Sequence, residues 1–211
     1  MTWIAAISRG HNAGVCLMKD GEIVFALEEE RLTRNKHDGA PLASIVKIKE
    51  FTDKLDYFVI AHTTPMSCHD EVKLDYCQDD PYYGLARKLG LVDTVTNSWK
   101  EGTYRECATG GRWPLNVIDV GTIHHRLHAA SAFYNSGYDD AIAIVVDANG
   151  SKTEEGIEIE SIFDAPSWKV LHRKYFSQDD IGIGKQYQQT CVNYGFDPED
   201  AGKIMGLAAY G

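Results

Sequence analysis

The sequence lacks the features that define several classes of protein. No apolar run approaches the roughly 20 residues of a membrane-spanning helix, and the N-terminus has neither the basic start nor the long apolar core of a signal peptide. The chain has only five cysteines and no CxxC pair, which argues against a disulfide framework or a cysteine zinc site. We therefore expect reduced thiols, a cytoplasmic location and no membrane partner.

Positive charge is also scarce. The chain carries 21 Lys and Arg against 31 Asp and Glu, a formal net charge of −10, and this argues against binding nucleic acid mainly through phosphate neutralisation. The hydrophobic content of 44% and charged content of 25% are typical of a globular protein. A chain of 211 residues is long enough for one domain or two small lobes with a sizeable core.

Alternating apolar segments predict two similar groups of elements. In each group three strands precede a helix, and an Asp-Gly pair at Asp20-Gly21 predicts a tight hairpin in the first. The repeat predicts a mixed α/β fold with two lobes, 1–138 and 139–211, the second of them incomplete. The predicted strands are 2–8, 13–18, 22–27, 57–61, 115–120, 141–147, 156–163 and 168–175, with helices at 41–51, 123–134 and 181–194.

The stretch 62–114 interrupts this regular order. Its scattered prolines, aromatics and cysteines predict no clear succession of elements. The spacing of Cys68, His69 and Cys77 fits no common zinc pattern. We interpret the stretch as an insertion that shapes a substrate entrance.

Three histidines lie within five residues, just before an apolar strand. His124 and His128 are four residues apart and would share one face of the predicted helix. The continuous apolar run 141–146 predicts a strand buried on both faces. It ends at Asp147, where a turn-like sequence would present the carboxylate. Two imidazoles and one carboxylate suit a divalent metal with open coordination positions. The alternative is a surface helix with ordinary histidines and an aspartate that begins a turn.

A second polar stretch covers residues 28–39. It contains Arg31, Arg34 and Lys36, whose cationic groups could hold an anion. It could equally be a solvated loop or the end of a helix. His11 lies in the turn that follows the first predicted strand.

Four motifs, in this order along the chain, resemble the N-terminal region of the nodulation and antibiotic-tailoring O-carbamoyltransferases. They comprise residues 11–13 with 19–24, 28–31 with 36–39, 124–134, and 202–211. The resemblance implies a ribonuclease H-like, actin-like ATPase fold of the sugar kinase–Hsp70 type. It also implies a two-step reaction, in which carbamoyl phosphate and ATP form carbamoyl-adenylate and the carbamoyl group then passes to a substrate hydroxyl.

The resemblance assigns roles to particular residues. It implies that His124, His128 and Asp147 hold a divalent metal, with iron as the expected ion, together with an aspartate from later in the chain. His11 falls at the position of the general base, and Lys36 at the position that contacts the carbamoyl-adenylate. The remaining nucleotide contacts implied are Arg34, Asn149, Gly150 and Lys203.

The expected partners follow from the same resemblance. The acceptor would be a small molecule with a hydroxyl, such as a sugar, an antibiotic or a modified nucleoside, and homo-oligomer formation is left open. Because the second lobe has only three strands and a helix before the closing motif, we expect a fragment or one part of a split protein. The remainder of the enzyme would then lie in the same or another chain.

Two other functions compete with this one. The first is a non-catalytic actin-like fragment or subunit that needs a missing partner half. The second is a relative that transfers threonylcarbamoyl to tRNA, against which the acidic charge and the 28–39 motif argue.

Overall fold

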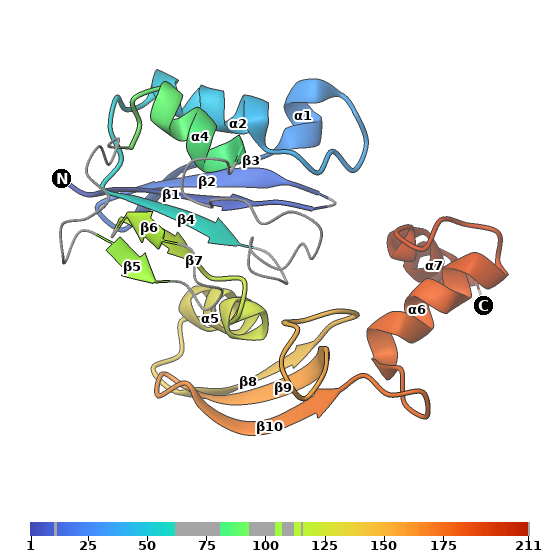
Figure 1. Ribbon diagram of the computed structural model, residues 1–211. Coiled ribbons are helices and arrows are strands. Elements are labelled where there is room, and N and C mark those ends of the chain that lie inside the picture. Colours follow the sequence, from blue (N-terminus) through green and yellow to red (C-terminus); the bar gives the residue numbers. More distant parts are fainter. Residues whose placement is uncertain (11, 62–80, 93–103, 107–111, 115, 211) are drawn as a thin grey trace. The chain divides into compact units, whose positions relative to one another are not determined.

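The computed structural model describes residues 1–10, 12–61, 81–92, 104–106, 112–114 and 116–210 (Figure 1). His11 therefore lies outside the described residues, as do Cys68, His69 and Cys77. The contacts divide the chain into two compact units, Met1–Gly121 and Thr122–Gly211. Within the described parts, no helix is long and apolar enough to cross a membrane.

The first unit is built on a five-stranded sheet of order β3-β2-β1-β4-β7. The first three strands are antiparallel, while β4 and β7 run parallel to β1. Helices lie over one face of this sheet in Figure 1. The strands are β1 (Trp3–Ser8), β2 (Gly14–Lys19), β3 (Glu22–Glu28), β4 (Tyr57–Ala61) and β7 (Val117–Asp119), and the short β5 (Tyr104–Glu106) and β6 (Arg112–Pro114) form a separate hairpin. The helices are α1 (Glu29–Thr33), α2 (Leu42–Lys47), η1 (Ile48–Glu50) and α4 (Pro81–Lys88).

The alternation of residues along the strands explains where the first core lies. Ala5 and Ile7 of β1 are buried in a cluster that includes apolar residues of α2 and α4. Intervening positions such as Ala6 point to the other face, because successive side chains of a strand alternate. The hairpin between β2 and β3 turns at Asp20 and Gly21, both with positive φ, as the Asp-Gly pair predicted.

The second unit contains a separate antiparallel sheet of order β10-β9-β8. Helix α5 packs on it through a small core of Ala129, Val145 and Phe163. The elements are α5 (His124–Ser136), β8 (Ala141–Val146), β9 (Glu158–Ala165), β10 (Lys169–Tyr175), α6 (Gly182–Asn193), α7 (Ala201–Leu207) and η3 (Ala208–Tyr210). The prediction of a mixed α/β structure is thus confirmed.

The contacts place α5 in the unit that begins at Thr122, because α5 packs against β8 and β9. The lobes 1–138 and 139–211 stay a prediction. The strand 141–146 was expected to be buried on both faces, and this is wrong in the described residues. Val145 is 7% exposed whereas Ile144 is 69% exposed, since α5 covers only the face to which Val145 points.

Candidate metal centre

Helix α5 brings two imidazoles together. His124 and His128 are one helical turn apart, and their Nε2 atoms lie 3.0 Å from each other. The start of the helix is held by the hydroxyl of Ser151, which accepts the backbone N–H of His124 at 3.0 Å. Both rings are reachable from solvent, with side-chain exposures of 21% for His124 and 55% for His128. The pair is therefore both close and accessible.

Asp147 faces this pair from the end of β8. Its Oδ1 accepts the backbone N–H of Ala148 at 2.6 Å, so one carboxylate oxygen is already engaged. The other oxygen, Oδ2, lies 3.0 Å from Nε2 of His124 and 3.6 Å from Nε2 of His128. The carboxylate is thus turned so that a single oxygen points at the two histidines.

The three ligand atoms fit the dimensions of a metal site. Metal–nitrogen and metal–oxygen bonds of about 2.1 Å place two ligand atoms roughly 3.0 Å apart at a right angle and roughly 3.4 Å apart at a tetrahedral angle. The observed separations of 3.0, 3.0 and 3.6 Å agree with both geometries. Among the described residues, this is the group of His, Cys, Asp and Glu side chains found close enough to share an ion. Its donors suit Fe²⁺, Zn²⁺ or a similar ion and leave positions open.

Electrostatics favour the charge state that a cation needs. Burial opposes ionisation of Asp147, but hydrogen bonds with His124 and His128 outweigh it and hold the pKa of the carboxyl well below its usual range. The neighbouring His125 behaves differently, because burial lowers the pKa of its imidazole from 6.5 to about 4. At neutral pH the site combines a carboxylate with a neutral buried ring.

His125, which lies between the two other histidines in the sequence of α5, is buried. Its side chain is 1% exposed, and its Nδ1 lies 2.8 Å from the hydroxyl oxygen of Ser161 on β9. Its Nε2, however, lies 4.0 Å from Oδ2 of Asp147. The ring of His125 therefore does not lie on the helical face of His124 and His128, but its Nε2 is near the carboxylate that these two histidines contact.

Two glycines allow the backbone around Asp147 to pack closely. A Cβ at Gly150 would lie 2.3 Å from Nε2 of His125, so no side chain fits there while the ring keeps its place. A Cβ at Gly184, in the first turn of α6, would lie 2.4 Å from the backbone nitrogen of Ala148. Neither close approach was foreseen, because the residues involved are far apart in the sequence.

No described contact joins the predicted nucleotide-binding residues of this unit, Asn149, Gly150 and Lys203, to one another. Asn149 is half-buried, and Gly150 donates its backbone N–H to the carbonyl of Glu158 at 2.7 Å. The ammonium of Lys203 is 2.6 Å from a carboxylate oxygen of Asp200, one turn away on α7. Their role towards a nucleotide stays a prediction.

In the first unit, the buried carboxylate of Glu30 binds other groups of the polar stretch 28–39. Glu30 has a side-chain exposure of only 6%, and its carboxylate lies 3.2 and 3.1 Å from the ammonium of Lys36. It also accepts the backbone N–H of His37 at 3.1 Å. This N–H and the lysine together lower the pKa of Glu30. Arg34 ends α1 in the left-handed region, at φ 61°.

A second buried acid, Glu29, anchors the same segment. Its carboxylate accepts the backbone N–H groups of Ala43 and Ser44 at 2.7 and 2.8 Å, which are the first free donors of α2. The hydroxyl of Ser44 donates to it as well. Sequence reasoning missed both acids, because three consecutive glutamates are typical of a solvated surface.

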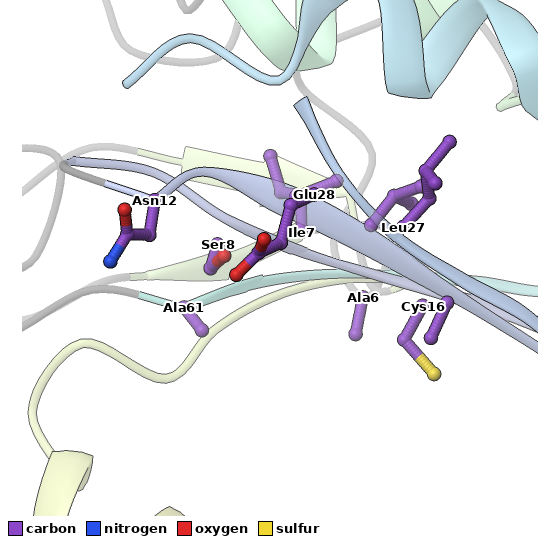
Figure 2. A pocket seen from close by; sticks show the side chains of 11 residues that line it. Ala6, Ile7, Ser8, Asn12, Cys16, Leu27, Glu28 and Ala61 are labelled. Carbon is purple, nitrogen blue, oxygen red and sulfur yellow. The ribbon is translucent and has the colours of Figure 1, made fainter. Parts of the chain in front are cut away.

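The described residues on either side of position 11 are joined to this loop by backbone hydrogen bonds. Gly10 donates to the carbonyl of Gly39 at 3.1 Å, and Ala13 donates to the carbonyl of Asp38 at 2.9 Å. Beside these residues lies a cavity of about 470 Å³ on the face of the sheet to which Ala6 points. Figure 2 shows Asn12, Ser8 and the carboxylate of Glu28 towards one end of this cavity.

Comparison with known proteins identifies the family of the chain. Residues 4–211 match the family described as carbamoyltransferase N-terminus, and the chain belongs to that family. Nodulation protein NolNO of Sinorhizobium fredii is 29% identical over 95% of this chain and 28% of its own length. Uncharacterised proteins of Synechocystis and Methanocaldococcus jannaschii are 29% and 27% identical, over 100% and 98% of this chain and 35% and 33% of theirs. The chain thus spans about a third of the length of these relatives.

Proposed function

We propose that this chain is the N-terminal part of an O-carbamoyltransferase that uses carbamoyl-adenylate, made from carbamoyl phosphate and ATP, to carbamoylate a substrate hydroxyl. The observation that carries the proposal is the convergence of His124, His128 and Asp147 in a chain of the carbamoyltransferase family. We call His124, His128 and Asp147 the metal cluster, and the stretch 28–39 with its Arg31, Arg34 and Lys36 the cationic loop. Both kinds of site suit a reaction that moves a carbamoyl group away from a phosphate.

The topology supports an actin-like arrangement within this proposal. The first unit has the order β3-β2-β1-β4-β7, with an antiparallel meander followed by two strands parallel to β1. The second unit begins with another antiparallel meander and then a helix, α6. Both sequences of elements agree with a ribonuclease H-like lobe and the start of a second one.

The residues divide the proposed chemistry between them. His124, His128 and Asp147 hold the metal ion, with Fe²⁺ as the proposed ion, which when bound supplies positive charge beside the phosphate oxygens. Lys36 stabilises negative charge on the carbamoyl-adenylate, since an ammonium has three donors and Glu30 engages it from one side only. His11 accepts the proton of the attacking hydroxyl as its oxygen bonds to the carbamoyl carbon and the bond to AMP breaks.

The wider assignments complete the proposal. Arg34, Asn149, Gly150 and Lys203 are proposed to contact the nucleotide. The acceptor is a sugar, an antibiotic or a modified nucleoside, and the reaction takes place in the cytoplasm. Carbamoyl-adenylate is made by the remainder of the enzyme, in the same or another chain. The enzyme can form a homo-oligomer.

Two measurements test this function. Isothermal titration of the chain with Fe²⁺ under anaerobic conditions, or with Co²⁺ as a stable substitute, should show one site that is lost in the Asp147→Ala variant. The protein made from the full reading frame that contains this chain should release AMP from ATP only when carbamoyl phosphate is present. It should then transfer carbamoyl from ¹⁴C-carbamoyl phosphate to a hydroxyl acceptor.

The same assay separates the enzyme from a non-catalytic subunit. A scaffold or partner subunit would show neither AMP release nor carbamoyl transfer when assayed with its own reading frame. AMP release without transfer to any panel of sugars, antibiotics and nucleosides would contradict the proposed acceptor class alone. Transfer of a threonylcarbamoyl group to tRNA, in place of carbamoyl transfer to these acceptors, would support the tRNA relative instead.

A further inference from the structure

His125 occupies an unusual position for a polar residue. It lies on the buried stripe of α5 with Ala129 and Phe133, which faces the sheet. An apolar side chain would satisfy a purely structural role here without the cost of burying two ring nitrogens. The hydrogen bonds of its ring therefore bear on the role of His125.

Only one of its two nitrogens has a partner among the described residues. Nδ1 lies 2.8 Å from the hydroxyl oxygen of Ser161, which is itself fully buried. Nε2 is buried without a hydrogen-bond partner. It is nonetheless directed to the metal cluster, where Oδ2 of Asp147 lies 4.0 Å away. Gly150 packs close to this nitrogen, since a Cβ at Gly150 would lie 2.3 Å from it.

The carboxylate decides where the single proton of a neutral ring resides. A serine hydroxyl can donate or accept, so Ser161 is compatible with either tautomer. An N–H at Nε2 is attracted by the negative charge of Asp147, whereas a lone pair at Nε2 is repelled by it. The favoured arrangement has the Ser161 hydroxyl donating to Nδ1 and the Nε2–H directed at Asp147.

This N–H gains importance when the site is filled. His124 and His128 turn their Nε2 atoms towards Asp147 and towards each other, so a metal would take the lone pairs of both. Neither could then donate a hydrogen bond from that atom to the carboxylate. In the described part of the chain, His125 would remain as the imidazole N–H beside Oδ2 of Asp147.

From this geometry we infer that His125 is a positioning residue of the metal centre, held as the Nε2–H tautomer by the charge of Asp147 with the Ser161 hydroxyl donating to Nδ1, so that it orients Oδ2 of Asp147. The inference rests on the proposed metal site. Partners that orient a metal ligand commonly change metal affinity by about 10–100-fold when they are removed. His125 thus takes part in metal binding without touching the ion.

A matched pair of substitutions tests the inference. The amide nitrogen of asparagine occupies the position of Nδ1, and that of glutamine the position of Nε2. His125→Asn should therefore keep a group near Ser161 but lose the N–H towards Asp147, and should bind Co²⁺ about 10–100-fold more weakly than the wild type. His125→Gln restores an N–H near Asp147 and should recover most of the affinity. Circular dichroism and thermal unfolding check that both variants fold.

Two spectroscopic measurements do not depend on these variants. The visible ligand-field spectrum of bound Co²⁺ should change in Ser161→Ala. This substitution removes the hydroxyl that binds Nδ1 of His125 and leaves all three metal ligands in place. Long-range ¹H–¹⁵N correlation on the wild-type chain should identify His125 as protonated at Nε2.

Each outcome decides the question. An Nδ1–H tautomer, unchanged Co²⁺ affinity in His125→Asn, or equal weakening in both His125 variants would overturn the positioning role and leave the metal site standing. If the folded wild-type chain binds no Co²⁺, the metal site fails and this inference fails with it.

Discussion

The metal cluster and the cationic loop were both recognisable as candidate sites, but they are built in opposite ways. His124, His128 and Asp147 come from a helix and from the end of a strand, and their ligand atoms face one another directly. Lys36 lies in a loop, with a side-chain exposure of 70%, and is held by the buried Glu30. Regular elements thus bring ligands together through their own geometry, whereas a loop needs buried partners to define the position of its charges.

The largest expected effect concerns His11, whose described neighbours are joined to that loop. Replacing His11 with Ala should slow carbamoyl transfer by on the order of 10²–10⁴-fold, because a positioned base contributes that much to proton removal from a hydroxyl. Pyrophosphate release from ATP that depends on carbamoyl phosphate, measured in a single turnover, should stay nearly intact, since it reports adenylate formation and precedes this step. Both rates are measured on the protein from the full reading frame. Equal loss of both activities in a folded variant would contradict the role of His11 as base.

The next prediction separates the two regions by metal binding. His124→Ala should lower Co²⁺ affinity by more than the roughly 100-fold that loss of an indirect partner reaches, because a direct ligand is removed. Lys36→Ala should bind Co²⁺ as the wild type does. The exposed His172 of β10 provides a matched histidine control. Titration calorimetry gives the three affinities, and weakening in His172→Ala would indicate adventitious binding.

A third prediction concerns the stability of the metal-free chain as a function of pH. Burial lowers the pKa of His125 in the folded chain from its usual 6.5 to about 4. Between these two pH values the unfolded state therefore binds a proton that the folded state does not. The contribution of the neutral His125 ring to the free energy of unfolding is therefore fully present above pH 6.5 and falls as the pH is lowered. At roughly 1.4 kcal/mol per pH unit, the loss attributable to this ring at pH 5 is about 2 kcal/mol.

Urea unfolding at pH 7 and pH 5, in the presence of a chelator, measures this loss. The His125→Gln variant serves as the comparison because glutamine does not titrate. The difference in unfolding free energy between the two pH values should be smaller in this variant by about 2 kcal/mol. Identical pH dependence of the two proteins would show that His125 is not the titrating group.

The smallest expected effect sharpens the role of the buried acids. Glu29→Gln keeps the size of the side chain but replaces an acceptor with an amide N–H that faces the donors of Ala43 and Ser44. We expect a loss of about 1–2 kcal/mol in unfolding free energy. Glu50→Gln, at a side-chain exposure of 63%, is the matched control and should change stability little. Equal effects in the two variants would mean that Glu29 does not anchor α2.

Local patterns were sufficient for much of the fold. Alternation predicted the strands around Ala5 and Ile7, and the Asp20-Gly21 pair predicted the turn between β2 and β3. The one-turn spacing of His124 and His128 predicted a shared helical face. Each of these predictions depends on residues close together in the chain, where the repeat of a helix or strand dictates the geometry.

Contacts between distant segments could not be anticipated in the same way. The burial of Glu29 requires the start of α2 to meet the end of β3, and the constraint on Gly150 requires the ring of His125 to pack against it. Nor could hydrophobicity alone reveal that Ile144 is exposed, since this depends on which face α5 covers. Periodicity specifies how side chains alternate along one element, but burial and pairing arise from which elements pack together. Hence the candidate metal ligands could be named from their spacing, whereas the contacts of Glu30 and His125 depend on partners brought near by folding.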